Sequence, residues 1–229
     1  SAGTTLSPMQ LFAGALLERP PGPKYLAELG FAELSPPEPL PKPATLARWR
    51  QNLPDGFVLG LRAPETCWRS PEGALRPGEA LDAGIRWLGE ASDALEASVV
   101  VVATDASLTT GARDRERLRE YFGRIPRKEG RSIVWRPSGL WEPEAVQVTA
   151  DSMLVIGGFD AVDDPVPDAD VLYASLLAEG LRRSFSHAQL LEVLDKLERS
   201  SASSAFVTIE SAQSFREAKL LKALFEGRE

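Results

Sequence analysis

The chain has 229 residues, of which 43% are hydrophobic and 26% are charged. These fractions are those of an ordinary globular protein, and they exclude disordered and fibrous architectures. Lys and Arg number 26 against 33 Asp and Glu, a net charge of −7 at pH 7, so a broad basic face is absent and no nucleic-acid partner is expected.

The first residues carry no targeting signal that we recognise. We interpret residues 1–9 as an N-terminal tail, with Ser1, Ala2 and Gly3 as a remnant of cloning, and residues 10–229 as one domain. A signal peptide has a basic segment before an apolar one, and a membrane span needs about 20 apolar residues. Neither pattern is found, so we expect a cytoplasmic protein with no membrane contact.

Short apolar segments alternate with segments of helical period along the whole chain. The predicted strands are residues 10–15, 31–34, 57–63, 98–104, 132–136, 153–157, 171–176 and 205–210. The predicted helices are residues 23–29, 44–52, 77–95, 114–125, 141–150, 186–197 and 215–225. The unbroken valine run 99–102 indicates a strand covered on both faces, as in parallel sheets.

Eight such strands in a chain of this length favour a compact (β/α)8 TIM-like barrel. The alternative is an open doubly wound sheet, but Gly14 after the first strand does not begin a Gly-x-Gly-x-x-Gly phosphate motif. The first strand is short, so an incomplete or degenerate barrel is also considered. A proline-rich segment from Pro36 to Pro43 follows the second strand, and in a barrel it forms a stiff loop on the face where active sites are built.

Several segments resemble the YecE-like family, also called the domain-of-unknown-function-72 family. They are FAEL (31–34), ATLARW (44–49), PDGFVLGLRAP (54–64) and VWRPS (134–138). The corresponding family pattern reads approximately VEINSTFYRLPSPET…RW, then TPxGFxFAVKAP, then VEFRHPSW. The resemblance covers most of the chain by order and spacing, and it implies a (β/α)8 barrel of unestablished activity.

The chain departs from this pattern at most polar positions. Glu33 and Arg136 match the family's glutamate and arginine, Arg62 stands in place of a lysine, and Pro137 stands in place of a histidine. The family's FQLPP is VATDA (102–106), its YxRLHG is YASLLA (173–178), and its FNN or FND is IES (209–211). The resemblance therefore implies that the chain has lost most of the family's polar lining.

Four charged residues are expected at the carboxyl ends of strands, facing the barrel mouth: Glu33, Arg62, Arg136 and Glu210. Two arginines and two carboxylates could hold an anionic ligand, with a glutamate as general base. The other interpretation is a self-neutralising ion-pair network that fills the top of the barrel, because buried charges need partners.

Two loops carry further candidates. Asp160, Asp163, Asp164, Asp168 and Asp170 crowd the loop after the sixth strand, where carboxylates suit Mg²⁺ or Ca²⁺. Prolines interrupt this run and it lacks the EF-hand spacing, so a solvated loop is the default and no metal is predicted.

The loop after the seventh strand offers Arg182, Arg183 and Ser184 just before a helix. Barrels often bind phosphate near their seventh and eighth loops, so a ligand-binding role is considered beside that of a surface loop with a helix cap. Trp141, with Leu140 before it, is the aromatic residue expected to make an exposed contact on the same face.

A single cysteine and a single histidine limit the chemistry. They exclude an internal disulfide and zinc sites built from Cys and His clusters. His187 is expected to be exposed in the first turn of a helix, where an imidazolium is disfavoured. Cys67 is interpreted as a buried or half-buried inert thiol, since no base is identified beside it.

The sequence thus predicts a degenerate barrel that works as a binding or scaffolding module, with no cofactor. A protein partner is expected at the proline-rich loop, and a small anionic ligand at the charged mouth. The alternative is a hydrolase or nuclease-like enzyme that acts on a phosphorylated or carboxylated ligand through Glu33, Arg62, Arg136 and Glu210. A metal-dependent form of this enzyme would have to recruit Asp105 or Asp160.

Overall fold

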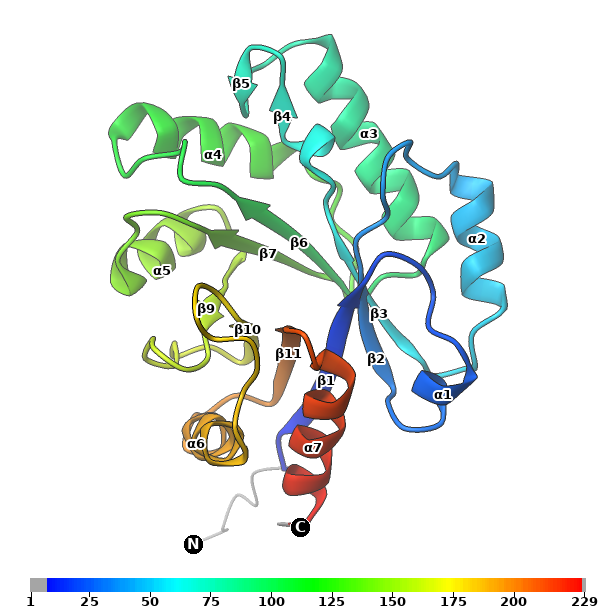
Figure 1. The fold of residues 1–229 in the computed structure, drawn as a ribbon. Coiled ribbons are helices and arrows are strands. Elements are labelled where there is room, and N and C mark those ends of the chain that lie inside the picture. Colours follow the sequence, from blue (N-terminus) through cyan, green and yellow to red (C-terminus); the bar gives the residue numbers. More distant parts are fainter. Residues whose placement is uncertain (1–7, 228–229) are drawn as a thin grey trace, which may run out of the picture.

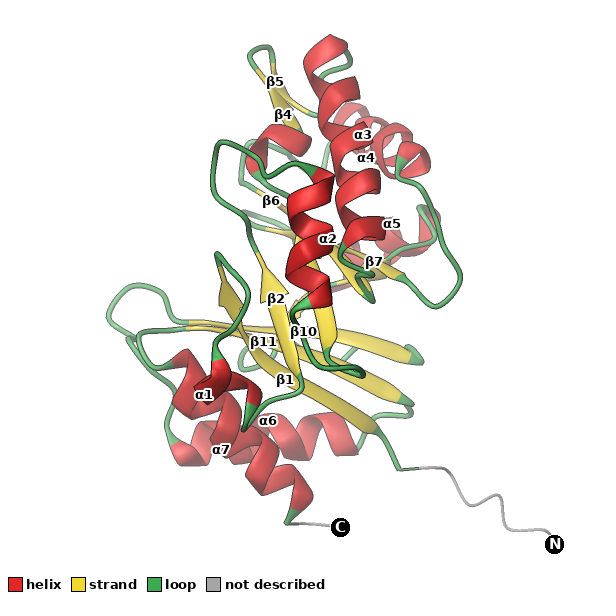
Figure 2. Cartoon of the chain, turned by 90° about the vertical axis from the view of Figure 1, so that its right-hand side faces the viewer, coloured by secondary structure: helices red, strands yellow, loops and turns green. Residues whose placement is uncertain are grey.

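Nine parallel strands form a barrel with helices on its outside (Figures 1 and 2). The computed structural model describes residues 8–227, so the predicted tail 1–9 lies mostly outside the described residues. The strands of the barrel are β1 (Gln10–Leu17), β2 (Phe31–Leu34), β3 (Val58–Arg62), β6 (Val99–Thr104), β7 (Ser132–Pro137), β8 (Ile156–Gly157), β9 (Phe159–Asp160), β10 (Val171–Leu177) and β11 (Ser204–Glu210). Their order is β8-β7-β6-β3-β2-β1-β11-β10-β9.

The ring closes through one short segment. β8 and β9 stand at the two ends of the strand order but are separated in sequence by Gly158 alone. β8 pairs with β7 and β9 pairs with β10. The N–H of Gly158 donates to the carbonyl of Trp135 at 2.8 Å, so β8 and β9 together act as the sixth strand of an eight-membered barrel.

Gly158 lies close to the side chains of two residues on the neighbouring strands, Arg136 and Tyr173. A Cβ at this position would lie 3.1 Å from Cβ of Arg136 and 3.2 Å from Cδ1 of Tyr173. Because Gly158 has no side chain, the inward side chains of Arg136 on β7 and Tyr173 on β10 can approach each other across the sixth strand.

The predicted sixth strand, residues 153–157, is wrong in its first half. α5 (Pro143–Ser152) ends just before it, and the N–H groups of Met153 and Val155 both donate to the carbonyl of Ala150. Leu154 has a φ of 56°, which is a helix-ending conformation rather than a strand one. The apolar run that suggested a strand thus begins by capping the helix.

The first strand is longer than predicted and completes the ring. β1 pairs with β11 over residues 10–15 and with β2 at Leu16 and Leu17. The first strand therefore takes its place in the ring, between β11 and β2. Gly14 is needed for this junction, because a Cβ there would lie 2.3 Å from the carbonyl oxygen of Phe31.

All seven predicted helices form, with shifted ends. They are α1 (Pro23–Leu26), α2 (Pro43–Gln51), α3 (Glu79–Ala94), α4 (Ala112–Arg124), α5, α6 (His187–Glu198) and α7 (Ser214–Glu226). The predicted cap of α6 is present as a capping box between Ser186 and Gln189. A 3₁₀ helix (Glu65–Cys67) and the hairpin β4 (Arg69–Ser70) and β5 (Gly73–Ala74), which precede α3, were not predicted.

Alternation along the strands separates two cores. Inside the barrel, Phe31, Val99, Val101, Val134, Tyr173 and Phe206 form one cluster, whereas leucine-rich positions pack between the strands and the helices. Inward side chains recur every second residue. The position that follows Phe31 on the inner face is therefore Glu33, and those that follow Phe206 are Thr208 and Glu210, so polar groups come to lie at the mouth.

Candidate functional site

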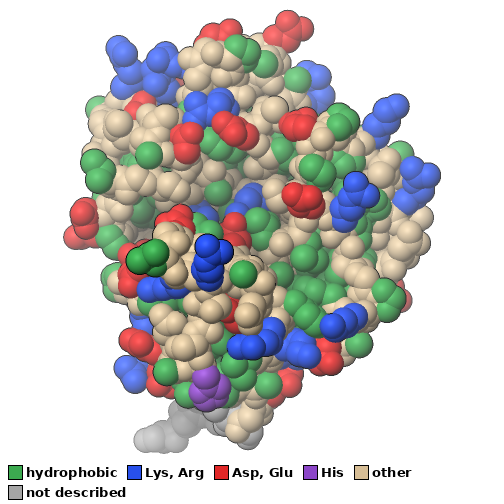
Figure 3. Space-filling model, viewed as in Figure 1, with side chains coloured by type: hydrophobic (Ala, Val, Ile, Leu, Met, Phe, Trp, Pro, Cys, Tyr) green, Lys and Arg blue, Asp and Glu red, His purple; other side chains and the backbone are tan. Residues whose placement is uncertain are grey.

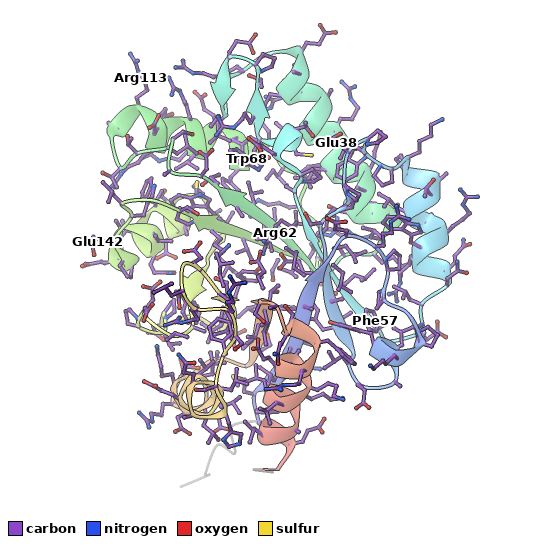
Figure 4. All side chains as sticks on the ribbon, viewed as in Figure 1. Glu38, Phe57, Arg62, Trp68, Arg113 and Glu142 are labelled. Carbon is purple, nitrogen blue, oxygen red and sulfur yellow. The ribbon has the colours of Figure 1, made fainter. Side chains whose placement is uncertain are left out.

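The structure brings the four predicted charged residues together at the carboxyl ends of the strands. Glu33 lies on β2, Arg62 ends β3, Arg136 lies on β7 and Glu210 ends β11. Arg62 lies in the centre of the ring of strands (Figure 4). In the same view the surface is hollowed near its middle, where basic and acidic side chains lie side by side (Figure 3).

Arg62 joins both glutamates. Its Nε donates to Oε2 of Glu33 at 2.7 Å, and its Nη1 and Nη2 donate to the two oxygens of Glu210 at 2.7 and 3.1 Å. The Glu33 side chain is fully buried, and those of Arg62 and Glu210 are 11% and 17% exposed. Burial opposes the charge on Arg62, but Glu33, Tyr173 and Glu210 together raise its pKa, so the guanidinium stays charged.

Two residues that sequence reasoning missed complete the environment of Glu33. The hydroxyls of Tyr173 and Thr208 donate to its Oε1 at 2.5 and 3.0 Å. Both lie on inward positions of β10 and β11, and this alternation was the signal that could have found them. Each oxygen of Glu33 thus accepts from a neighbour and neither reaches solvent, so this carboxylate cannot act as a base without breaking the network.

Arg136 is bound more loosely than Arg62. Its Nε donates to Oγ of Ser175 at 2.7 Å, and its Nη1 lies 3.7 Å from Oε2 of Glu210. Ser175, on β10, was also missed by sequence reasoning. Glu33, Arg62, Glu210, Tyr173 and Thr208 are here called the central network. Arg136 is held at its edge.

The chain's three tyrosines provide a test of this packing. Burial raises the pKa of Tyr25 to about 12 and that of Tyr121 well above its usual value. Burial and the neighbouring Glu33 also raise the pKa of Tyr173. An unfolded tyrosine ionises near pH 10. Above that pH the unfolded state releases protons that the native state keeps, so stability falls as pH rises.

We therefore expect no phenolate absorbance at 295 nm from the folded chain at about pH 11, where exposed tyrosines are ionised. The absorbance should grow only as the far-ultraviolet circular dichroism is lost. A tyrosine that titrates near pH 10 while the chain is still folded would contradict the buried network.

Arg182 and Arg183 line a cleft beside the central network. This cleft, here called the α7 cleft, has a volume of about 560 Å³, and Glu210, Ser211 and Ser214 also line it. Ser184 does not belong to the lining. Neither arginine lies within ion-pair distance of a carboxylate among the described residues, in contrast to Arg62 and Arg136.

The loop that carries these arginines is fixed by a buried carboxylate. Glu217, on α7, accepts from the N–H of Phe185 at 2.7 Å and from Oγ of Ser211 at 2.5 Å. The N–H of Ala212 donates to the carbonyl of Arg183 at 3.1 Å. The two loops that border the α7 cleft are thus tied to each other.

A second cleft lies beside Arg136. This cleft, here called the Arg136 cleft, has a volume of about 300 Å³, and its lining includes Arg136, Ser175, Asp160, Asp164 and Glu179.

Trp141 also lines the Arg136 cleft. The prediction was an exposed contact, but the side chain is held by its neighbours. It is half-buried, meets Trp135 edge to face at 4.8 Å, and donates from Nε1 to the carbonyl of Leu108 at 3.0 Å. Leu140 is 96% exposed, as the sequence suggested.

The acidic loop is organised by its own backbone. Oδ1 of Asp160 accepts from the N–H groups of Val162 and Asp163, and Oδ2 of Asp164 accepts from the N–H of Asp160. Asp163, Asp168 and Asp170 do not line the Arg136 cleft. Within residues 8–227, no group of three or more His, Cys, Asp or Glu side chains is arranged to hold a metal ion.

Asp105, the other candidate for a metal-dependent enzyme, is engaged elsewhere. Its carboxylate accepts from Arg69 and from Ser107. Burial opposes its charge, but the donors of Ser107 and the guanidinium of Arg69 lower the pKa of Asp105 below its usual value.

Cys67 and His187 are not part of the central network. Cys67 is fully buried in the 3₁₀ helix, and burial, with a smaller effect from Glu38, raises the pKa of its thiol to about 12. A thiol in this state is a poor nucleophile. His187 is exposed at the start of α6.

The proline-rich loop borders a third cleft, with a volume of about 710 Å³. Pro36, Pro37 and Glu38 line it together with residues that follow β1 and β3. The protein partner expected at this loop stays a prediction. No helix among residues 8–227 is both long and apolar enough to span a bilayer.

Comparisons with known proteins identify the fold. No family model matches the chain, and no curated protein sequence matches it. A DUF72 family protein from Enterococcus faecalis has a TM-score of 0.62 at 12% identity, over 95% of this chain and 98% of that protein. A protein from Thermus thermophilus, in a crystal soaked with zinc chloride, gives 0.61 at 18% identity over 96% and 99%. Endonuclease IV from the same organism gives 0.55 at 12% identity over 97% and 100%.

These similarities extend over nearly the whole chain but at low identity, so they concern the fold. They confirm the TIM-like barrel predicted from the strand pattern and the fold that the resemblance to the YecE-like family implied. The chain therefore has the TIM-barrel fold found in DUF72 family proteins and in endonuclease IV.

Proposed function

We propose that this protein is a binding module whose barrel mouth receives a small anionic ligand, and that the central charges are structural rather than catalytic. The observation that supports the proposal is that both oxygens of the Glu33 carboxylate already accept hydrogen bonds from the protein. Three donors hold its two oxygens, and its side chain is fully buried. A general base needs an oxygen within reach of the substrate proton, and this carboxylate offers none.

The anion is expected in the α7 cleft. Arg62 is neutralised by Glu33 and Glu210, whereas Arg182 and Arg183 face no carboxylate at ion-pair distance among the described residues. A guanidinium binds phosphate or carboxylate through paired, charge-assisted hydrogen bonds. Glu217 fixes the loop from which they extend, which lowers the entropy lost when a ligand binds.

Titration calorimetry with inorganic phosphate and ribose 5-phosphate tests this proposal. We expect saturable binding that weakens at least tenfold in the Arg182→Ala/Arg183→Ala variant. The matched control is Arg113→Ala/Arg119→Ala, which removes two positive charges from α4 and should bind as the parent does. Absence of binding by the parent chain would contradict the proposal.

The enzyme alternative gives a different pattern. Endonuclease IV is a nuclease by name and shares this fold, so the assay includes cleavage of a DNA duplex and a direct test of DNA binding. Phosphate binding that is lost in Arg136→Ala but kept in Arg182→Ala/Arg183→Ala would place the ligand on the central charges. Such a result, together with DNA cleavage, would favour the hydrolase.

A further inference from the structure

The Arg136 cleft brings together one arginine, which is held only loosely by Glu210, and three carboxylates. Its lining includes Arg136 and Ser175 together with Asp160, Asp164 and Glu179. One arginine against three carboxylates gives this cleft a net charge of −2. Its volume of about 300 Å³ suits a small molecule.

Arg136 has donors to spare. A guanidinium carries five N–H groups. In Arg136, Nε donates to Ser175 at 2.7 Å, and the contact of Nη1 with Glu210 is 3.7 Å, beyond hydrogen-bond distance. The terminal nitrogens can therefore take a ligand carboxylate without losing the bond that positions the side chain.

The carboxylates of the cleft have acceptors to spare. Asp160 uses Oδ1 for two backbone N–H groups, and Asp164 uses Oδ2 for one. Lys196, the cation bound to this loop, donates to the backbone carbonyls of Ala161, Val162 and Asp164 rather than to carboxylates. No cation of residues 8–227 pairs with the carboxylates of Asp160, Asp164 or Glu179.

Sheet register and one hydrogen bond place Asp160 and Arg136 beside the same residue, Ser175. Asp160 and Ser175 are partners on the adjacent strands β9 and β10, and neighbouring strands lie about 4.8 Å apart. Arg136 is bonded to Ser175. Asp160 and Arg136 therefore both lie beside Ser175, so one small molecule in the cleft can contact both. Pro143 and Val146 add an apolar stretch to the lining.

We propose that the Arg136 cleft binds an α-amino acid with a cationic side chain, of the lysine or arginine class. The ligand carboxylate binds Arg136, its two cationic groups bind the carboxylates of Asp160, Asp164 and Glu179, and its methylene chain packs on Pro143 and Val146. A net ligand charge of +1 complements the cleft. A simple anion would meet three carboxylates, and a simple diamine would leave Arg136 unpaired. This site is separate from the α7 cleft.

Titration calorimetry of the full chain with L-lysine tests the inference, beside two matched ligands that each lack one group. Norleucine lacks the side-chain ammonium and cadaverine lacks the carboxylate. We expect L-lysine to bind saturably and at least tenfold more tightly than either. Glu179→Gln should weaken lysine binding at least fivefold, because Glu179 is exposed and the substitution removes a charge without disturbing the core.

The control is Glu144→Gln, an equal change of charge on an exposed residue of α5 that does not line the cleft. It should leave lysine binding unchanged. The inference is overturned if lysine does not bind, if cadaverine or norleucine binds as tightly, or if Glu144→Gln weakens binding as much as Glu179→Gln. Saturable Ca²⁺ binding lost in Glu179→Gln, without lysine binding, would instead assign the carboxylates to a cation.

Discussion

Replacing Arg62 by methionine is expected to lower the free energy of unfolding by about 3–5 kcal/mol. The substitution leaves the fully buried carboxyl group of Glu33 without its charged partner, because Tyr173 and Thr208 supply hydroxyls only. An uncompensated buried charge is among the most destabilising defects that a protein can contain. Urea denaturation followed by circular dichroism measures the loss, with an unchanged slope as evidence that the native fold is kept.

A double variant distinguishes the loss of the ion pair between Arg62 and Glu33 from the cost of leaving Glu33 buried without a charged partner. In Arg62→Met/Glu33→Gln no buried carboxylate remains unpaired, and Glu210, 17% exposed, can be hydrated. This variant should be more stable than the sum of the two single substitutions predicts. A loss below about 1 kcal/mol in Arg62→Met, the value of a surface ion pair, would show that the central network is solvated and open to ligands.

Replacing Trp135 by alanine should cost a similar amount, about 3–5 kcal/mol. Trp135 is fully buried on β7, donates from Nε1 to Oγ1 of Thr104 at 3.0 Å, and packs edge to face against Trp141. Truncation leaves a large void in the core and removes the side chain against which Trp141 packs. Thermal and urea denaturation measure the effect.

Two further variants test the cause of this loss. Trp135→Phe keeps an aromatic ring but loses the hydrogen bond, so an intermediate loss is expected. Trp49→Ala removes a half-buried tryptophan from α2 and should cost less, because less apolar surface is lost from the core. Equal losses at residues 49 and 135 would contradict the packing described for β7.

Strand and helix positions were predictable because their signals are local. The buried valines of β6 and the buried leucines of α6 recur in regular patterns within one short segment. The sixth strand was misplaced for the same reason. Residues 153–156 are apolar in sequence, yet the first three turn out of α5. A short apolar run does not reveal whether it caps a helix or enters a sheet.

The central charges were predictable only in part. Their place at the ends of strands follows from alternation, and Glu33, Arg62, Arg136 and Glu210 do meet. Their partners did not follow, because Thr208 and Glu33 are 175 residues apart and Arg62 and Glu210 are 148 apart. Only the closed ring brings such distant positions within hydrogen-bond distance.

The sequence by itself determined which segments become strands and helices and which residues face the barrel axis, since both depend on short-range periodicity. Tertiary structure decided that Gly158 splits the sixth strand, that Tyr173 and Thr208 saturate Glu33, and that the charges left unpaired lie in two flanking clefts. These outcomes depend on the stagger of strands around a closed barrel, which sets the neighbours across the ring and is not encoded in any single segment.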